Sequence, residues 1–210
     1  MTDQISVNAQ SSIRIGGETV LYFDPFRITN AAQDADIILI THPHFDHFSP
    51  ADIAKVKKPD TVFVAPESMA AELKEAGIPA PVLMKPGESK TVCGISVEAV
   101  PAYNRLKPFH PKRKGWLGYV VTVGGKRIYA AGDTDATDEA ANVRCDIALI
   151  PIGGTYTTNS SEAAALVNRM QPQTVIPVHY GSIVGQISNG DAFAEAVKAP
   201  VQVKLLLHRN

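Results

Sequence analysis

Short apolar runs alternate with clusters of Gly, Pro and Asp along the chain, which predicts strands and helices in alternation. Two β-rich runs flank Gly16-Gly17, a pair typical of a β-hairpin turn. Ser49-Pro50 predicts a helix start, because serine caps free backbone N–H groups and proline suits the first helical position. The elements expected in the first half are a hairpin over 13–23, buried strands over 37–40 and 61–65, a helix from residue 50 and a helix over 67–76.

The second half repeats this order at an offset of roughly 110 residues, which indicates a duplication rather than a solenoid. The run Asp146-Ile147-Ala148-Leu149-Ile150 closely matches Asp36-Ile37-Ile38-Leu39-Ile40, and Gly124-Gly125 again joins two β-rich runs. The elements expected here are a hairpin over 119–130, a strand over 146–150, a helix over 160–170, a strand over 174–176, a helix over 191–198 and a last strand over 201–207.

Two similar halves with sheets that are apolar on both faces predict an α/β fold, a four-layer α/β/β/α sandwich. The alternative is an ordinary doubly wound sheet. In the sandwich, functional loops gather where both sheets end on the same edge. No stretch has the composition of a linker, so residues 1–210 are expected to form a single domain.

Composition excludes several classes of function. The net charge of −1 provides no global field that favours nucleic acid or an anionic membrane. Cys93 and Cys145 lie far apart, without the spacing of a disulfide framework or a CxxC site. No targeting segment or membrane-spanning run is evident, so we expect a cytoplasmic protein without a membrane partner.

Three histidines and an aspartate follow directly on a predicted core strand, as His42, His44, Asp46 and His47. Neutral imidazole and carboxylate are ligands of borderline divalent metals. Because alternate residues of a loop point to one side, His42 and His44 are expected to hold one ion, and Asp46 and His47 to face another. A surface histidine tract or tag would not follow a core strand and contain Phe45.

The segment His42-x-His44-x-Asp46-His47 resembles the HxHxDH signature of the metallo-β-lactamase superfamily. Gly132-Asp133-Thr134 resembles the family's GDT motif, whose aspartate bridges two metals, and Pro177-Val178-His179-Tyr180 resembles its late strand-end histidine. The resemblance covers nearly the whole chain in the family's order. It implies the metallo-β-lactamase fold, with Asp133 and His179 as further ligands.

Within that superfamily, Phe23-Asp24-Pro25 and Pro151-Ile152-Gly153-Gly154 are similar to the branch that includes L-ascorbate phosphate lactonase. That likeness implies a small-molecule hydrolase and a homo-oligomer.

One position departs from the family pattern. The family usually places a histidine where this chain has Asn104, and an amide is a weak ligand for such metals. His110, in the following loop, is expected to reach back as a ligand or substrate contact; the alternative is a solvated loop histidine. If His110 does not ligate, the His42/His44 site is incomplete. The last histidine, His208, is expected to have no role.

The resemblance implies hydrolysis by metal-bound hydroxide, with one or two divalent ions. Zinc is the first choice, and Mn, Fe or Ni also suit such ligands. Asp46 is expected to hold the nucleophile or transfer its proton, and Asp133 to bridge, so both are assigned to catalysis. Asp135 is expected either to support a metal-binding histidine or to stabilise a turn.

The loop over 105–116 carries five cations and no acid: Arg105, Lys107, Lys112, Arg113 and Lys114. If this loop lines the mouth, it suits an anionic ester, lactone or phosphoester; otherwise it is a solvated surface loop. Tyr156 and its neighbouring threonines are expected either to provide hydroxyls near the metals or to cap a helix. The candidate substrate contacts are Asn104, Lys112, Arg113 and Tyr156.

Other functions remain open. A nuclease or phosphodiesterase shares the HxHxDH motif, but such enzymes tend to carry an added RNA-gripping segment, and this chain is short and near neutral. A redox member would be expected to have extra modules or characteristic cysteines. A metal-free binding module would be expected to have lost ligands, and only the Asn104 position is altered.

Overall fold

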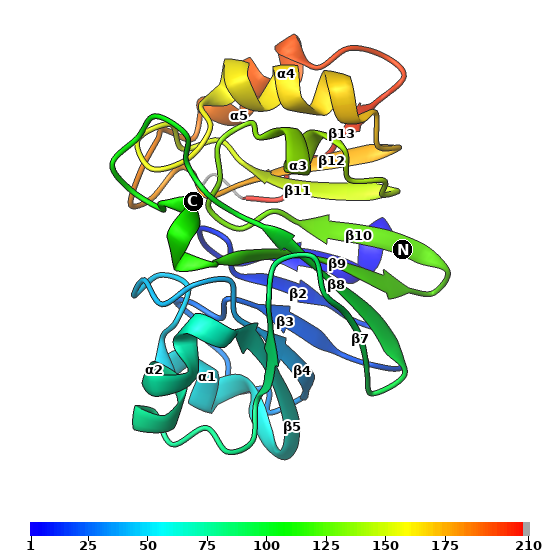
Figure 1. Ribbon diagram of the computed structural model, residues 1–210. Coiled ribbons are helices and arrows are strands. Elements are labelled where there is room, and N and C mark those ends of the chain that lie inside the picture. The colour runs from blue at the N-terminus through cyan, green and yellow to red at the C-terminus, as the bar shows by residue number, and fades with distance from the viewer. Residues whose placement is uncertain (208–210) are drawn as a thin grey trace.

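Two mixed β-sheets pack face to face, with helices on both outer faces, in the computed structural model, which describes residues 1–207 (Figure 1). The order of layers is helices, sheet, sheet, helices, so the predicted four-layer α/β/β/α sandwich is confirmed and the doubly wound alternative is wrong. His208 lies outside the described residues.

The first sheet has the order β1-β2-β3-β4-β5-β6. Its first three strands are antiparallel and the rest are parallel. The helices of this half pack against the outer face through a buried apolar cluster that includes Ile38, Ile53 and Leu73. The bounds are β1 Ile5–Val7, β2 Ile13–Ile15, β3 Leu21–Phe23, β4 Ala35–Leu39, β5 Lys57–Pro66, β6 Val82–Met84, α1 Pro50–Val56 and α2 Ala70–Glu75, with 3-10 turns at Thr2–Gln4 and Glu67–Met69.

The second sheet has the order β13-β12-β11-β10-β9-β8-β7. Strands β7 to β10 are antiparallel, and β10 to β13 are parallel. The bounds are β7 Ser89–Val92, β8 Ile95–Pro101, β9 Leu117–Val123, β10 Lys126–Ala130, β11 Ile147–Pro151, β12 Thr174–Val178, β13 Gln202–Val203, α3 Asp138–Ala141, α4 Ser160–Met170 and α5 Asn189–Ala196, with a 3-10 turn at Lys112–Lys114.

The central strands are buried on both faces. In β4, Ile37 and Leu39 belong to the core between the sheets, whereas Ile38 packs under the helices. Alternate side chains of a strand point to opposite faces, so a run that is apolar at every position fits between two apolar layers. The continuous apolar runs noted in the sequence follow from this arrangement.

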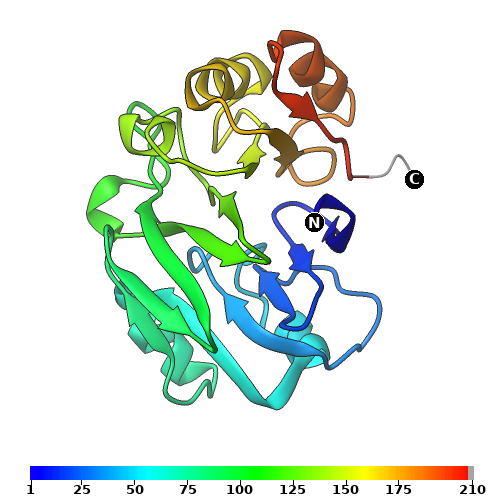
Figure 2. The same ribbon diagram turned by 90° about the vertical axis from the view of Figure 1, so that its right-hand side faces the viewer.

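Local signals define several elements well. Helix α4 begins after Asn159, which forms a capping box with Glu162, and ends at Met170, as predicted. The last strand was predicted over 201–207, which is wrong in length: β13 is Gln202–Val203, because only these two residues pair with β12. The segments at the two ends of the described chain lie side by side (Figure 2), where Lys204 Nζ donates to Thr2 Oγ1 at 2.6 Å.

Hydrogen bonds join the two halves at one edge of the sandwich. Leu117 N donates to Thr41 O at 3.1 Å, and the buried Tyr119 hydroxyl donates to Ile40 O at 2.8 Å. At the same edge, His179 N donates to Gln10 O at 2.9 Å. These bonds fix the loop after β4 and the end of β12 against the opposite half of the fold.

Gly118 lies in β9 where no side chain fits. A Cβ atom at this position would lie 2.8 Å from Ala130 O and would also overlap Ala131 O, and both neighbours are backbone. Gly118→Ala is therefore expected to lower the free energy of unfolding by about 1–3 kcal/mol, as overpacking does. Gly16→Ala is the control, because its Cβ would meet only the end of the Arg14 side chain closely, at 2.9 Å. Equal urea midpoints for the two variants would contradict this expectation.

Candidate metal centre

All seven residues predicted as metal ligands come together at one edge of the two sheets. Among residues 1–207 they form three overlapping groups, and within each group the potential ligand atoms lie within 4.8 Å of one another. The groups are His42/His44/His110, His42/His47/Asp133 and Asp46/His47/His179.

Each ligand candidate follows the end of a strand or lies in the loop that precedes β9. The segment from His42 to His47 follows β4, Asp133 follows β10, and His179 follows β12. Strands β4, β10 and β12 belong to the parallel parts of their sheets, and the carboxyl ends of parallel strands meet at one edge. The topology therefore gathers side chains that are far apart in the sequence.

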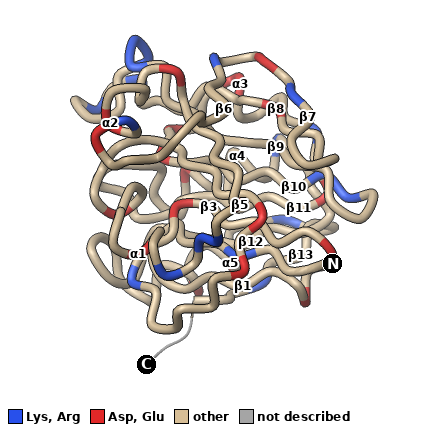
Figure 3. The backbone as a smooth tube through the Cα atoms, turned by 90° about the horizontal axis from the view of Figure 1, so that it is seen from below, with Lys and Arg blue, Asp and Glu red and all other residues tan. Residues whose placement is uncertain are grey.

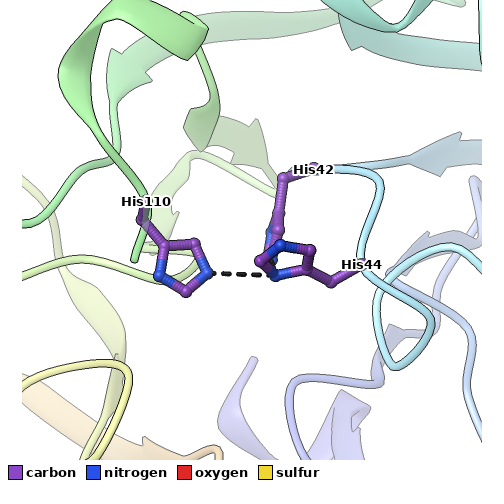
Figure 4. Close-up of side chains that lie close together, drawn as sticks. All are labelled: His42, His44 and His110. Carbon is purple, nitrogen blue, oxygen red and sulfur yellow. Dashed lines mark hydrogen bonds between the residues drawn. The ribbon is translucent and has the colours of Figure 1, made fainter. Parts of the chain in front are cut away.

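His42, His44 and His110 form the first group, in which the three rings lie close together and contact one another edge-on (Figure 4). His44 Nδ1 lies 3.0 Å from His42 Nε2 and 3.2 Å from His110 Nε2. Trp116 packs against all three rings, with centroid distances of 5.0, 5.0 and 5.4 Å. His110 therefore lies beside His42 and His44, the two histidines that it was expected to join.

Asn104, which stands where the family usually has a histidine, supports the His110 loop. Its backbone N–H donates to His110 O at 2.8 Å, and its side-chain Nδ2 donates to Tyr156 O at 2.7 Å. The same Nδ2 lies 3.3 Å from His110 Nδ1. The loop closed in this way holds His110 at φ +54, a conformation that a non-glycine residue adopts only when its surroundings impose it.

Asp133 lies between the groups. Its Oδ2 atom is 3.3 Å from both His110 Nε2 and His179 Nε2, and its Oδ1 atom is 3.3 Å from His47 Nε2. The side chain is 3% exposed, so its charge is removed from water. A carboxylate with histidines on several sides has the placement of a bridging ligand.

Several buried polar atoms of this cluster have no hydrogen-bond partner. His47 Nε2, His179 Nε2 and Asp133 Oδ1 are in this state. Leaving three such atoms unsatisfied costs about 1–3 kcal/mol each unless something else binds them. Because each of the three residues belongs to a group whose potential ligand atoms lie within 4.8 Å of one another, and imidazole nitrogen and carboxylate oxygen are ligands that divalent metals take, the residues fit a metal ion.

Burial and neighbouring charges together shift the pKa values of the cluster. Burial, and next the charge of His47, hold the pKa of His42 well below its ordinary value, which favours the neutral ring, the form that binds metal. Burial alone would lower the pKa of His47, but Asp133, Asp24 and Asp46 raise it to about 9. Burial alone would raise the pKa of Asp133, but His179 and His47 keep it well below the usual range.

Asp24 is a functional residue that sequence reasoning missed. Its fully buried carboxylate accepts hydrogen bonds from His47 Nδ1 at 2.7 Å, Thr41 Oγ1 at 2.6 Å and Thr41 N at 2.8 Å. These contacts fix the His47 ring with Nε2 toward Asp133. In the sequence, Asp24 was considered only as part of Phe23-Asp24-Pro25, which resembles the lactonase branch, and no role was assigned to it. Its place directly after a buried strand, like that of His42, was the available signal.

A cavity of about 280 Å³ opens onto the cluster, and Tyr156 is part of its wall. The other three candidate substrate contacts do not line it. Asn104 supports His110, Lys112 pairs with Glu139 at 2.7 Å, and Arg113 is exposed. The lining residues are His44, Phe45, Asp46, Phe109, His110, Asp133, Tyr156, His179 and Ile183.

Neighbouring polar residues have structural partners. Asp135 accepts a hydrogen bond from Arg105 N at 2.9 Å and pairs with Lys107, so its carboxylate stabilises the loop, the second of the two roles expected for it. Thr158 Oγ1 donates to Pro151 O, and Thr157 Oγ1 to Thr158 O. The hydroxyls of these threonines are therefore engaged with backbone.

Comparisons with known proteins agree with this site. Residues 5–179 match the family model described as "Beta-lactamase superfamily domain". A UPF0173 metal-dependent hydrolase from Methanoregula boonei is 31% identical over 205 residues, which cover 93% of this chain and 90% of that protein. One from Thermus thermophilus is also 31% identical, over 87% of this chain and 85% of that protein.

Among solved structures, a candidate metal-dependent hydrolase from Parabacteroides distasonis has a TM-score of 0.82 and 30% sequence identity. The match covers 97% of this chain and 93% of that one. The fold, the matched residues and the histidine–aspartate cluster agree with one another: the chain belongs to the metallo-β-lactamase superfamily and, within it, to the UPF0173 family of metal-dependent hydrolases.

Proposed function

We propose that this hydrolase cleaves a small ester or lactone at a centre of two divalent ions, with zinc as the first choice of metal. The observation that carries the proposal is the placement of Asp133 between overlapping ligand groups. One ion is assigned to His42, His44 and His110. The other is assigned to Asp46, His47 and His179, with Asp133 shared.

The chemistry divides between the ions and the protein. Bound divalent ions lower the pKa of a water ligand and polarise the oxygen of the bond under attack. Asp46 lines the cavity, so its carboxylate is placed to accept a proton from the attacking water. Trp116, which is 9% exposed, closes the site behind His42 and His44 and keeps bulk water away from that side.

An ester or lactone is favoured over a nucleic-acid phosphodiester. Cations and anions are interspersed over the face seen in Figure 3, and the net charge is −1. Backbone recognition of nucleic acid calls for a basic surface. The similarity of Phe23-Asp24-Pro25 to the lactonase branch supports the same choice.

In residues 1–207, none of the helices combines the length and apolar character needed to cross a membrane.

The presence of two ions is testable by elemental analysis. We expect about two ions per chain in the wild type and about one in His110→Ala, because the first ion loses a ligand. Lys114→Ala, an exposed change near His110, is the control and keeps both ions. One ion in both the wild type and His110→Ala would make the centre mononuclear. No bound metal in the wild type would refute the proposal.

The reaction class needs a separate measurement. The metal-loaded enzyme is expected to hydrolyse carboxylic esters or lactones faster than bis(p-nitrophenyl) phosphate. A preference for the phosphodiester would assign the chain to the alternative class.

A further inference from the structure

The cavity at the metal centre has two unlike walls. One wall consists of the ligand candidates His44, Asp46, His110, Asp133 and His179. The other consists of four large apolar or aromatic residues, Phe45, Phe109, Tyr156 and Ile183, which we call the apolar wall.

The apolar wall faces water although its rings are held in place. Phe45 is 66% exposed and Phe109 is 42% exposed. The Phe45 ring packs edge-on against Phe26 at 6.0 Å, and Phe109 packs edge-on against Tyr156 at 4.7 Å. Exposed apolar surface costs about 25 cal/mol per Å², so a fixed, uncovered apolar wall beside a reactive centre favours an apolar occupant.

Among residues 1–207, those that line this cavity include no lysine or arginine. Two cations of the 105–116 loop are already paired with acids, Lys107 with Asp135 and Lys112 with Glu139. A charged substituent would therefore meet no counter-charge at the apolar wall and would lose its hydration there.

We propose that the substrate carries an uncharged alkyl or aryl group that packs against the apolar wall while its ester or lactone carbonyl lies at the ligand cluster. This rests on the proposed function. In the reaction, water adds its oxygen to the carbonyl carbon, the acyl C–O bond breaks, and the departing oxygen takes the proton. The cavity volume of about 280 Å³ lies at the lower end of ligand pockets, so the group is small.

The test varies only the acyl chain. Metal-loaded enzyme is assayed with p-nitrophenyl acetate, butyrate and hexanoate, and we expect kcat/KM to rise about two- to fourfold per added methylene group. Phe45→Ala and Ile183→Ala are expected to bring the hexanoate-to-acetate ratio close to one. Leu106→Ala is the matched control, because Leu106 is 96% exposed in the same loop as Phe109 and does not line the cavity.

A second readout does not require turnover. The single tryptophan, Trp116, packs 5.0 Å from the ring of His44, which lines the cavity, so we expect its fluorescence to respond when the cavity is occupied. Titration with 1-hexanol is expected to change this fluorescence saturably in the wild type and in Leu106→Ala, and much less in Phe45→Ala. Ethanol at equal concentration serves as the reference.

The two readouts separate the two proposals. Saturable hexanol binding without hydrolysis of any ester or lactone would refute the proposed function and leave the apolar subsite standing. Hydrolysis that is independent of chain length, without hexanol binding, would overturn the subsite. A faster reaction with the negatively charged mono-p-nitrophenyl succinate than with the hexanoate would also overturn it. So would halving of the solution mass in Phe45→Ala, which would make the wall a contact between two copies.

Discussion

Replacing Asp133 with alanine is expected to lower kcat/KM by more than about 100-fold and to remove metal from the protein. Loss of a residue that only supports a metal ligand typically costs about 10- to 100-fold, and Asp133 itself faces the ligand atoms of three histidines. Its removal also takes away one of the carboxylates that face His47 and His179, both of which are buried. The loss is measured as metal per chain and as ester hydrolysis at saturating zinc.

The control for this variant is Asp138→Ala. Asp138 is 71% exposed and pairs with Arg169 on the surface, where an ion pair contributes about 0–1 kcal/mol to stability. Metal content and activity are expected to match those of the wild type. If Asp133→Ala retained two ions and normal activity, Asp133 would not be shared between ions, and the dinuclear centre would be refuted.

Replacing Asp24 with asparagine is expected to weaken metal binding by about 10- to 100-fold. Asparagine keeps the size of the side chain but loses the charge that faces His47 Nδ1 at 2.7 Å. The ring is then less firmly oriented, and its Nε2 atom is a poorer ligand. Competition with a chelating dye measures the affinity, and zinc in excess is expected to restore much of the activity.

Asp36→Asn is the matched control. Asp36 lies near the start of β4, whereas His42 follows the end of that strand. Its carboxylate accepts from Val20 N at 2.7 Å and pairs with Lys58. This variant is expected to change stability without changing metal affinity. Wild-type affinity in Asp24→Asn, together with a lower unfolding midpoint, would reduce Asp24 to a structural support for Thr41.

Sequence patterns predicted the central elements because those elements carry strong local signals. Strand β4 is apolar at consecutive positions, since both of its faces are covered, and α4 has a capping box at Asn159. Strands β1, β6 and β7 were missed. Each has only three or four residues, and β7 is exposed at three of its four positions, so none of the three strands has a long apolar run. Their pairing partners, rather than their own residues, make them strands.

The candidate site also contains some residues that the sequence makes evident and others that only the fold brings together. The four ligand candidates from His42 to His47 were evident because they are close in sequence. The hydrogen bond between Asp24 and His47, and the apolar wall that unites Phe45 with Ile183, join residues that only the folded chain brings together. The positive run 105–116 was read as one feature, although acids from other elements neutralise Lys107 and Lys112.

The hydrogen bonds that join the halves, from Leu117 to Thr41 and from His179 to Gln10, also bear on the order of events during folding. Contacts between distant parts of a chain form slowly, because a long loop must close first. A ribosome releases the His42 segment well before Asp133 and His179, so the nascent chain carries only part of the ligand set. We therefore expect stable uptake of metal to be a late event that follows docking of the two sheets.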